Sequence, residues 1–219
     1  MKINSTTIPL PIDNIDTDQI IPAKFLKQVD KAGYGKHLFN SWRYLSDGNL
    51  NPEFILNKSE RAEAKILVAG NNFGCGSSRE HAAWAIADYG IEAVISTQFA
   101  DIFKGNAYNN GILPIILVKE HVDSILQESL DNPAFTVDID LESQTVTAEQ
   151  INLKETFEIH PFKKQCLMDG VDETEYLTKH LTINSNKPKQ ILVPLRLINT
   201  EIRFQRKHWR NASPVMPSF

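Results

Sequence analysis

The feature that most constrains the fold is an alternation of strand-like and helix-like segments between residues 64 and 130. Short apolar runs typical of buried strands occupy Lys65–Ala69, Ile91–Thr97 and Ile112–Val118. The segments that follow them have the apolar spacing of helices, over residues 77–90, 98–109 and 122–130. Strands and helices in this order form right-handed βαβ units around a parallel sheet. The predicted fold class is therefore α/β, with a parallel sheet core and flanking helices.

Beyond Phe135 the continuous apolar runs give way to an alternation of apolar and polar residues. Residues 136–141 and 145–157 predict a β-hairpin or meander, hence an added antiparallel β layer beside the parallel core. Residues 30–62 have no sustained period and hold several aromatic side chains, which favours a binding loop region that faces a substrate over disorder. We predict one domain over residues 1–200 and a basic C-terminal tail over residues 201–219.

Charge and hydropathy exclude several classes of function. The 23 basic and 27 acidic residues give a net charge of −4, which lacks the basic footprint of a protein that binds nucleic acid. The longest apolar run is the seven residues Ile112–Val118, far short of the roughly 20 that span a membrane. Residues 1–10 have too many polar side chains for a signal peptide, so we expect a cytoplasmic protein without a membrane or nucleic-acid partner.

The segment from Gly70 to His81 contains the densest cluster of chemically useful residues. Its glycines allow the backbone to turn sharply and to approach a ligand closely. It lacks the lysine of a phosphate-binding P-loop, and Arg79 stands where a dinucleotide fingerprint needs Gly or Ala. One structural interpretation is a capping box, with Ser77 as N-cap and Glu80 as its partner. Against it, a cation at position 79 opposes the positive end of a helix dipole.

The functional interpretation of the same residues is an anion site. A helix N-terminus and an arginine fork both bind carboxylates, so Ser77, Ser78 and Arg79 could together hold a carboxylic acid. A serine hydroxyl becomes a base when glycine-loop amides, a helix dipole and a nearby arginine stabilise its alkoxide. Ser77 could then remove a proton next to a carboxylate. No nucleophile elbow is present, which disfavours a hydrolase.

Three blocks of sequence in this order resemble the swivelling β/β/α domain of the aconitase superfamily. They are Gly74–Ala82, which reads Gly-Cys-Gly-Ser-Ser-Arg-Glu-His-Ala, Asp13–Pro22, and Phe99–Phe103 continued by Asn106, Asn110, Gly111, Leu113 and Pro114. Further residues resemble, more narrowly, the small-subunit family of the bacterial 3-isopropylmalate dehydratases. These are Cys75, the run Gly35–Asn40, and Trp42, Arg43 and Tyr44.

The resemblance implies a hydro-lyase that is active only with a large subunit. That enzyme isomerises 2-isopropylmalate to 3-isopropylmalate through 2-isopropylmaleate, in leucine biosynthesis, and one iron of a [4Fe-4S] cluster takes the substrate hydroxyl. The large subunit holds the cluster, and this chain supplies no metal ligand. The two cysteines agree with that division, because such a cluster needs three or four thiolates. Cys75 is expected to pack beside the glycine turn, and Cys166 to be a buried thiol.

Residue by residue, the resemblance implies that Ser77 is the catalytic base and that Ser78 and Arg79 bind the substrate carboxylate. Arg43 is a candidate for a second carboxylate contact, and the alternative is a solvated loop arginine. Asp18 matches an acidic active-site residue, and the alternative is a structural Asx turn. His81 either bonds the active-site loop or fills the interface between helix and sheet.

Two other functions fit the same loop. One is the small subunit of a related hydro-lyase, of the citraconate, dimethylmalate or homoaconitate type. Substrate choice would then depend on residues 30–44, where the apolar Leu38 and Phe39 suit a branched alkyl group. The other is a noncatalytic module that binds an anion at the Ser77 helix terminus.

Overall fold

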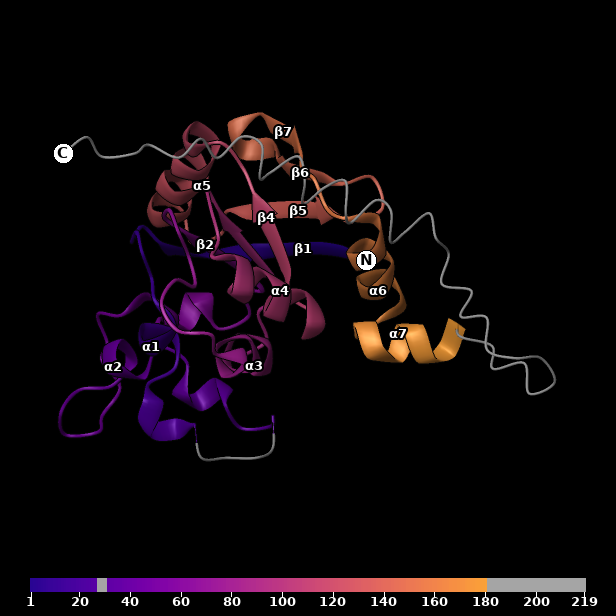
Figure 1. Cartoon of the computed structure of the whole chain (residues 1–219). Coiled ribbons are helices and arrows are strands. Elements are labelled where there is room, and N and C mark those ends of the chain that lie inside the picture. The colour runs from indigo at the N-terminus through magenta and orange to yellow at the C-terminus, as the bar shows by residue number, and fades with distance from the viewer. Residues whose placement is uncertain (27–30, 181–219) are drawn as a thin grey trace, which may run out of the picture. The chain divides into compact units, whose positions relative to one another are not determined.

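The computed structural model describes residues 1–26 and 31–180 of the chain. Its centre is one mixed sheet of seven strands in the order β4-β3-β2-β1-β5-β6-β7 (Figure 1). The strands are β1 (Lys2–Leu10), β2 (Ile66–Ala69), β3 (Ala93–Ser96), β4 (Leu113–Ile116), β5 (Thr136–Asp140), β6 (Thr145–Ala148) and β7 (Leu153–Thr156). The predicted α/β class is confirmed, and the antiparallel part joins the parallel part edge to edge.

Strand β1 joins the two parts of the sheet, and the sequence pattern does not predict it. Its second half pairs in parallel with β2, as at Thr7 with Ile66, and its first half pairs antiparallel with β5, as at Lys2 with Asp140. The polar run Asn4–Thr7 hides this strand, because apolar content is the main strand signal. Thr7 is nevertheless fully buried and its hydroxyl bonds to Ser129 Oγ at 2.5 Å.

Helices cover both faces of the sheet. In residues 1–172 they are α1 (Thr17–Ile20), α2 (Asn40–Arg43), α3 (Glu80–Asp88), α4 (Asp101–Asn109), α5 (Lys119–Asp131) and α6 (Pro161–Asp169). A separate helix, α7 (Glu173–His180), follows in the chain. Side chains of β2 alternate between two apolar cores, as the two-residue period of a strand requires. Leu67 and Ala69 pack in the core that contains α3, whereas Ile66 and Val68 pack in the core that contains α5.

Residues 31–62 form a segment, called here the covering segment, with short helical turns at Gly35–His37, Ile55–Asn57 and Ser59–Arg61. Leu38 and Phe39 have no exposed surface and belong to the core beside α3. The expectation that they face a branched alkyl group is therefore wrong: burial of their apolar surface in the core explains them.

The covering segment ends at Arg61, which is only 2% exposed. Its guanidinium donates to the carbonyl oxygen of Thr7 at 2.8 Å and to that of Ser129, so it joins β1 to the last turn of α5. An arginine near the carboxyl end of a helix satisfies carbonyl groups that have no partner inside the helix.

The chain divides into two compact units, residues 1–172 and residues 173–219, and α7 belongs to the second. The predicted basic tail, with Arg203, Arg206, Lys207 and Arg210, lies outside the described residues, and the predicted domain limit at residue 200 stays a prediction. Across residues 1–26 and 31–180, none of the helices has the length and apolar character needed to cross a membrane.

Candidate active site

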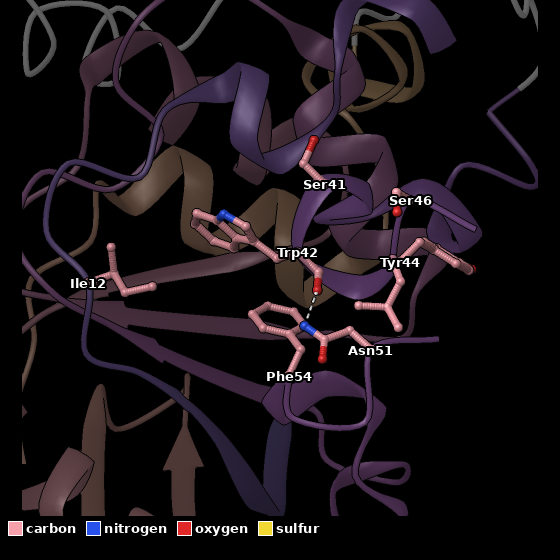
Figure 2. Close-up of a pocket in the computed structure, with 8 residues that line it drawn as sticks. Ile12, Ser41, Trp42, Tyr44, Ser46, Asn51 and Phe54 are labelled. Carbon is pink, nitrogen blue, oxygen red and sulfur yellow. Dashed lines mark hydrogen bonds between the residues drawn. The ribbon is translucent and has the colours of Figure 1, made fainter. Parts of the chain in front are cut away.

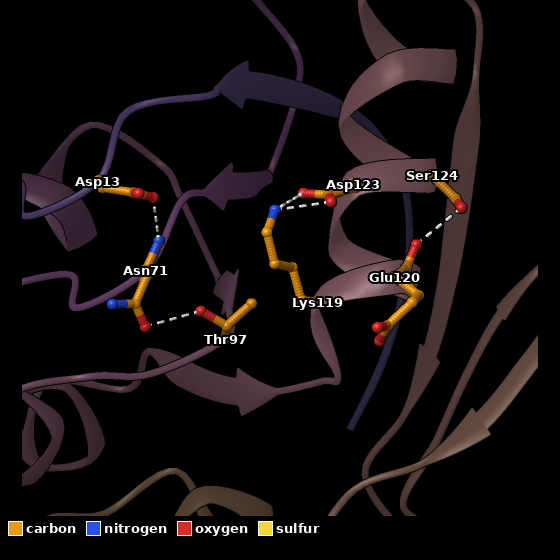
Figure 3. Close-up of polar contacts among 7 residues, drawn as sticks. All are labelled: Asp13, Asn71, Thr97, Lys119, Glu120, Asp123 and Ser124. Carbon is orange, nitrogen blue, oxygen red and sulfur yellow. Dashed lines mark hydrogen bonds and ion pairs between the residues drawn. The ribbon is translucent and has the colours of Figure 1, made fainter.

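The glycine loop, residues 70–79, follows the carboxyl end of β2, where ligands bind in sheets of this kind. Two neighbouring strands hold its first residues (Figure 3). Ser96, fully buried at the end of β3, donates to the carbonyl oxygen of Gly70 at 2.5 Å. Thr97 donates to the Asn71 side chain at 2.9 Å, and the Asn71 backbone N–H donates to Asp13 at 2.7 Å. The ends of β1, β2 and β3 thus fix where the loop starts.

Lys119 lies at the same edge of the sheet, after β4. Its ammonium bonds to Asp123, one turn further along α5, at 2.7 Å (Figure 3). This hydrogen bond raises the pKa of Lys119 above its ordinary value. The charge of Lys119 is therefore paired within its own helix.

The rest of the loop lies against the segment that follows β1. The backbone N–H of Asn14 donates to the Asn71 carbonyl oxygen at 2.8 Å, and the N–H of Gly74 donates to that of Ile15 at 2.7 Å. The Cys75 thiol contacts the Asn14 carbonyl oxygen at 3.4 Å, so Cys75 packs beside the glycine turn as expected. These bonds hold the loop by its main chain.

The turn at Gly74 and Gly76 exposes the two serines. Both glycines have positive φ angles, +76° and +87°. A Cβ on Gly74 would lie 2.2 Å from the Phe103 ring, so only glycine fits there. Ser77 and Ser78 follow the turn, and both are exposed. Their hydroxyls are open to a ligand.

The expected capping box at Ser77 and Glu80 is wrong. Helix α3 begins at Glu80, and its N-cap position is Arg79, whose side chain makes no capping hydrogen bond. The serines precede the helix, with Ser77 in a bend. A capping box does occur at Asp16 and Gln19 around α1, and the spacing of an acidic N-cap and a glutamine three residues later could have revealed it.

Arg79 pairs with Asp18, and this pair resolves the unfavourable charge near the helix terminus. Arg79 Nη1 contacts the Asp18 carboxylate, and the hydrogen bond lowers the pKa of Asp18 below its ordinary value of 3.8. The Arg79 side chain is 15% exposed and that of Asp18 is 54% exposed. Among the described residues, Arg79 Nε and Nη2 have no hydrogen-bond partner, which leaves one edge of the guanidinium for a ligand.

His81 takes part in aromatic packing. Its ring lies 4.4 Å from the Trp84 ring and 5.5 Å from the Tyr34 ring, measured between centroids. Tyr34 is fully buried. His81 therefore packs between α3 and the covering segment, and its two interpretations, a bond to the active-site loop or filling of the interface between helix and sheet, stay predictions.

Arg43 lies in the covering segment and binds within it. Its Nε donates to Asn57 Oδ1 and its Nη1 to the Gly35 carbonyl oxygen, both at 3.1 Å. Its guanidinium also lies 4.9 Å from the centre of the Tyr89 ring. Within residues 1–26 and 31–180, none of its contacts is with Ser77, Ser78 or Arg79.

A cavity of about 520 Å³ lies between the covering segment and Ile12 (Figure 2). It is lined by Ile12, Ser41, Trp42, Tyr44, Leu45, Ser46, Asn51 and Phe54. The Trp42 and Phe54 rings, 5.8 Å apart, form its apolar wall, and the Asn51 side chain donates to the Trp42 carbonyl oxygen at 3.0 Å. The cavity has no charged side chain in its lining, so it offers a carboxylate no cationic partner.

The donor set of this chain does not fit an iron-sulfur cluster. The sequence holds two cysteines, and Cys166 is buried while Cys75 lies on the glycine loop. A [4Fe-4S] cluster needs three or four thiolates. In the part of the chain that the structure describes, no group of three or more His, Cys, Asp or Glu side chains is arranged to hold a metal ion.

Known proteins are similar to this chain over the region that contains the candidate site. Residues 1–120, which contain β1 and the glycine loop, match the family model of the aconitase C-terminal domain. The 3-isopropylmalate dehydratase small subunit of Karelsulcia muelleri is 55% identical over 173 residues, which cover 79% of this chain and 87% of that protein. The small subunit of Azobacteroides pseudotrichonymphae is 50% identical over 177 residues, 81% of this chain and 90% of that protein.

A solved structure agrees in fold. The crystal structure of 3-isopropylmalate dehydratase from Methanocaldococcus jannaschii has a TM-score of 0.63 and 31% sequence identity, and the match covers 86% of this chain and all of that one. The family-model match and the sequence identity to these relatives place the chain in one family. The chain belongs to the aconitase C-terminal domain family and, within it, to the family of 3-isopropylmalate dehydratase small subunits.

Proposed function

We propose that this chain supplies the base and the carboxylate-binding side chains of a two-subunit hydro-lyase. The reaction isomerises 2-isopropylmalate to 3-isopropylmalate, by loss of water to 2-isopropylmaleate and addition of water at the neighbouring carbon. The observation that carries the proposal is the arrangement of the turn after Gly76. Two exposed serines, Ser77 and Ser78, stand directly before an arginine whose Nε and Nη2 have no hydrogen-bond partner among the described residues.

Ser77 acts as the base. It takes the proton from the carbon next to the hydroxyl-bearing carbon, and the electrons of that C–H bond form the C=C bond of the unsaturated diacid. The neighbouring C–O bond breaks in the same step, and the hydroxyl takes up a proton and leaves as water, a departure that a Lewis acid on the large subunit would assist. The Arg79 charge and the amides of the glycine loop favour the ionised hydroxyl. On the return step the same hydroxyl gives a proton back, so one residue serves both directions.

Ser78 and Arg79 bind the substrate carboxylate. The Nε and Nη2 edge of Arg79 can donate two parallel hydrogen bonds to a carboxylate. Asp18 occupies Nη1 and so sets the orientation of that edge. Arg43 stays in the proposal as a second carboxylate contact, although its guanidinium already bonds to Gly35 and Asn57.

A separate large subunit holds the [4Fe-4S] cluster in this proposal. The support is the donor set, since two cysteines at distant positions are too few for the cluster. Exposed catalytic hydroxyls also agree with a site that a partner completes. This chain then has the roles of binding, orientation and proton transfer.

Partner dependence tests the proposal. The purified chain, the large subunit with a reconstituted cluster, and their mixture are each assayed under anaerobic conditions for ultraviolet absorbance of the unsaturated diacid. We expect turnover in the mixture alone. A large subunit that is equally active without this chain, or a chain that is active by itself, would contradict the proposal.

The same assay separates the alternative functions. With homologous citraconate-, dimethylmalate- and homoaconitate-type substrates, we expect lower kcat/KM than with 2-isopropylmalate, and a reversed order would assign a related hydro-lyase. Calorimetric titration of the isolated chain with a dicarboxylate tests the binding module. Affinity equal to that of the assembled complex would favour the module.

A further inference from the structure

Thr17 makes an unusual pair of contacts with the turn that carries the proposed base. Its backbone N–H donates to the carbonyl oxygen of Cys75 at 2.9 Å. Its hydroxyl donates to the carbonyl oxygen of Ser77, also at 2.9 Å. One residue thus binds the carbonyl groups on both sides of Gly76.

Gly76 is the part of the turn that most needs such support. Its φ angle of +87° lies in the region that glycine alone adopts easily, and glycine also has the most freedom to leave it. A Cβ built on Gly76 would lie 3.7 Å from Thr17 Oγ1, in ordinary contact, so Thr17 lies directly against the turn. The peptide that precedes Ser78 is held by the Thr17 hydroxyl.

Thr17 is itself rigidly placed. Its side chain is only 2% exposed, and its neighbours Ile15 and Ile20 are fully buried in the core beside α3. The capping box fixes the turn in which it lies: the Gln19 N–H donates to Asp16 at 2.7 Å, and the Asp16 N–H donates to Gln19 at 2.8 Å. A buried hydroxyl on a capped turn is a fixed point against which the glycine turn is held.

We infer that Thr17 is a positioning residue, whose hydroxyl fixes the peptide of Ser77 and thereby aims the Ser77 side chain at the substrate. This inference rests on the proposed function of Ser77. Thr17 touches neither the substrate nor the reacting atoms. Its effect is preorganisation: a base displaced by about 1 Å can lose about 100-fold in rate.

The test compares hydroxyl with methyl at position 17 in the reconstituted two-subunit complex. Thr17→Val keeps the shape and loses the hydroxyl, whereas Thr17→Ser keeps the hydroxyl and loses the methyl group. We expect kcat of Thr17→Val to fall by about 10- to 100-fold with little change in KM, and Thr17→Ser to stay within about threefold of the wild type. If Thr17→Val does not fold, Thr17→Ala against Thr17→Ser makes the same comparison.

Thr7→Val is the matched control. Thr7 is also a fully buried threonine whose hydroxyl is hydrogen-bonded, but its partner is Ser129, on α5. We expect Thr7→Val to lower stability and leave kcat of the folded complex unchanged. A wild-type kcat in Thr17→Val, or a Thr17→Ser variant as slow as Thr17→Val, overturns the inference.

A double variant shows whether Thr17 acts through Ser77. Thr17→Val combined with Ser77→Ala should be no slower than Ser77→Ala alone, within about twofold, because residues that act as one unit are non-additive. Full additivity of the two losses overturns the inference. An unchanged kcat in Ser77→Ala alone overturns the proposed function instead, so the two failures are distinguishable.

Discussion

The glycine loop, residues 70–79, and the covering segment, residues 31–62, are both irregular and both contain arginine, yet the fold holds them in different ways. The loop is held by its main chain, through bonds such as Gly74 N–H to the Ile15 carbonyl oxygen. The segment has main-chain bonds as well, such as Phe39 N–H to the Ile20 carbonyl oxygen, but it also buries large side chains, with Tyr34 and Phe39 fully buried. A region fixed by its backbone keeps its side chains for a ligand, whereas a region that also buries its side chains has few to offer.

The arginines of the two regions differ in the same way. Arg61 is buried and bonds to the carbonyl oxygens of Thr7 and Ser129. Arg79 pairs with one exposed carboxylate, that of Asp18, and its Nε and Nη2 have no further partner in the described part of the chain. Sequence composition cannot separate these two environments, but substitutions can. We expect changes at buried residues of the segment, such as Arg61, to affect stability, and changes in the loop to affect catalysis.

The largest expected effect on stability is that of Arg61→Met. It leaves buried carbonyl oxygens without donors, and each such group costs about 1–3 kcal/mol. We expect the free energy of unfolding to fall by about 2–4 kcal/mol, measured by urea denaturation, with kcat of the folded complex unchanged. A loss below about 0.5 kcal/mol, the range of neutral surface substitutions, would show that Arg61 does not join β1 to α5.

Arg79→Lys should act on substrate binding. It keeps the positive charge but loses the planar fork, and a hydrogen bond to a charged group contributes about 1.5–3 kcal/mol. We expect KM for 2-isopropylmalate to rise by about 10- to 150-fold, with a small change in stability. Arg43→Lys is the matched variant. An equal rise in KM there would place Arg43 in the substrate site, and an unchanged KM in Arg79→Lys would remove Arg79 from it.

Gly76→Ala and Gly48→Ala compare the two regions at glycines with nearly equal φ angles, +87° and +85°. A Cβ fits at both positions without a clash. We therefore expect a similar loss of stability, about 1 kcal/mol each, from the strained backbone alone. Turnover should fall only in Gly76→Ala. Equal turnover in the two variants would mean that the geometry of the turn does not matter for catalysis.

Asp18→Asn should have the smallest effect on stability, at most about 1 kcal/mol, because the ion pair is exposed. The pKa of Asp18 is lowered in the folded state by Arg79. A lowered pKa means that the pair stabilises the fold above the ordinary value of 3.8 and that this contribution is lost as pH falls through the lowered value. The difference between wild type and variant, followed by thermal unfolding against pH, should shrink on acidification. A difference that grows would contradict the pairing.

Much of the parallel core could be predicted from the sequence because its strands are continuous apolar runs between helices. Strand β1 could not, because its buried Thr7 is polar and is stabilised by Ser129 from a distant helix. The residues of the glycine loop were identified by their chemistry and their resemblance to a family. The start of α3 was predicted too early, since Ser77 has the composition of a cap but its carbonyl oxygen is bound by Thr17. Such long-range contacts leave no local pattern.

The central claim is that Ser77 is the base, and its direct test is the turnover of Ser77→Ala in the reconstituted complex. Ser46→Ala, an exposed serine of the covering segment, is the control. We predict that kcat falls by about 10²- to 10⁴-fold in Ser77→Ala, the usual contribution of a positioned base, and stays at the wild-type value in Ser46→Ala. A wild-type kcat in a folded, assembled Ser77→Ala complex would contradict the account.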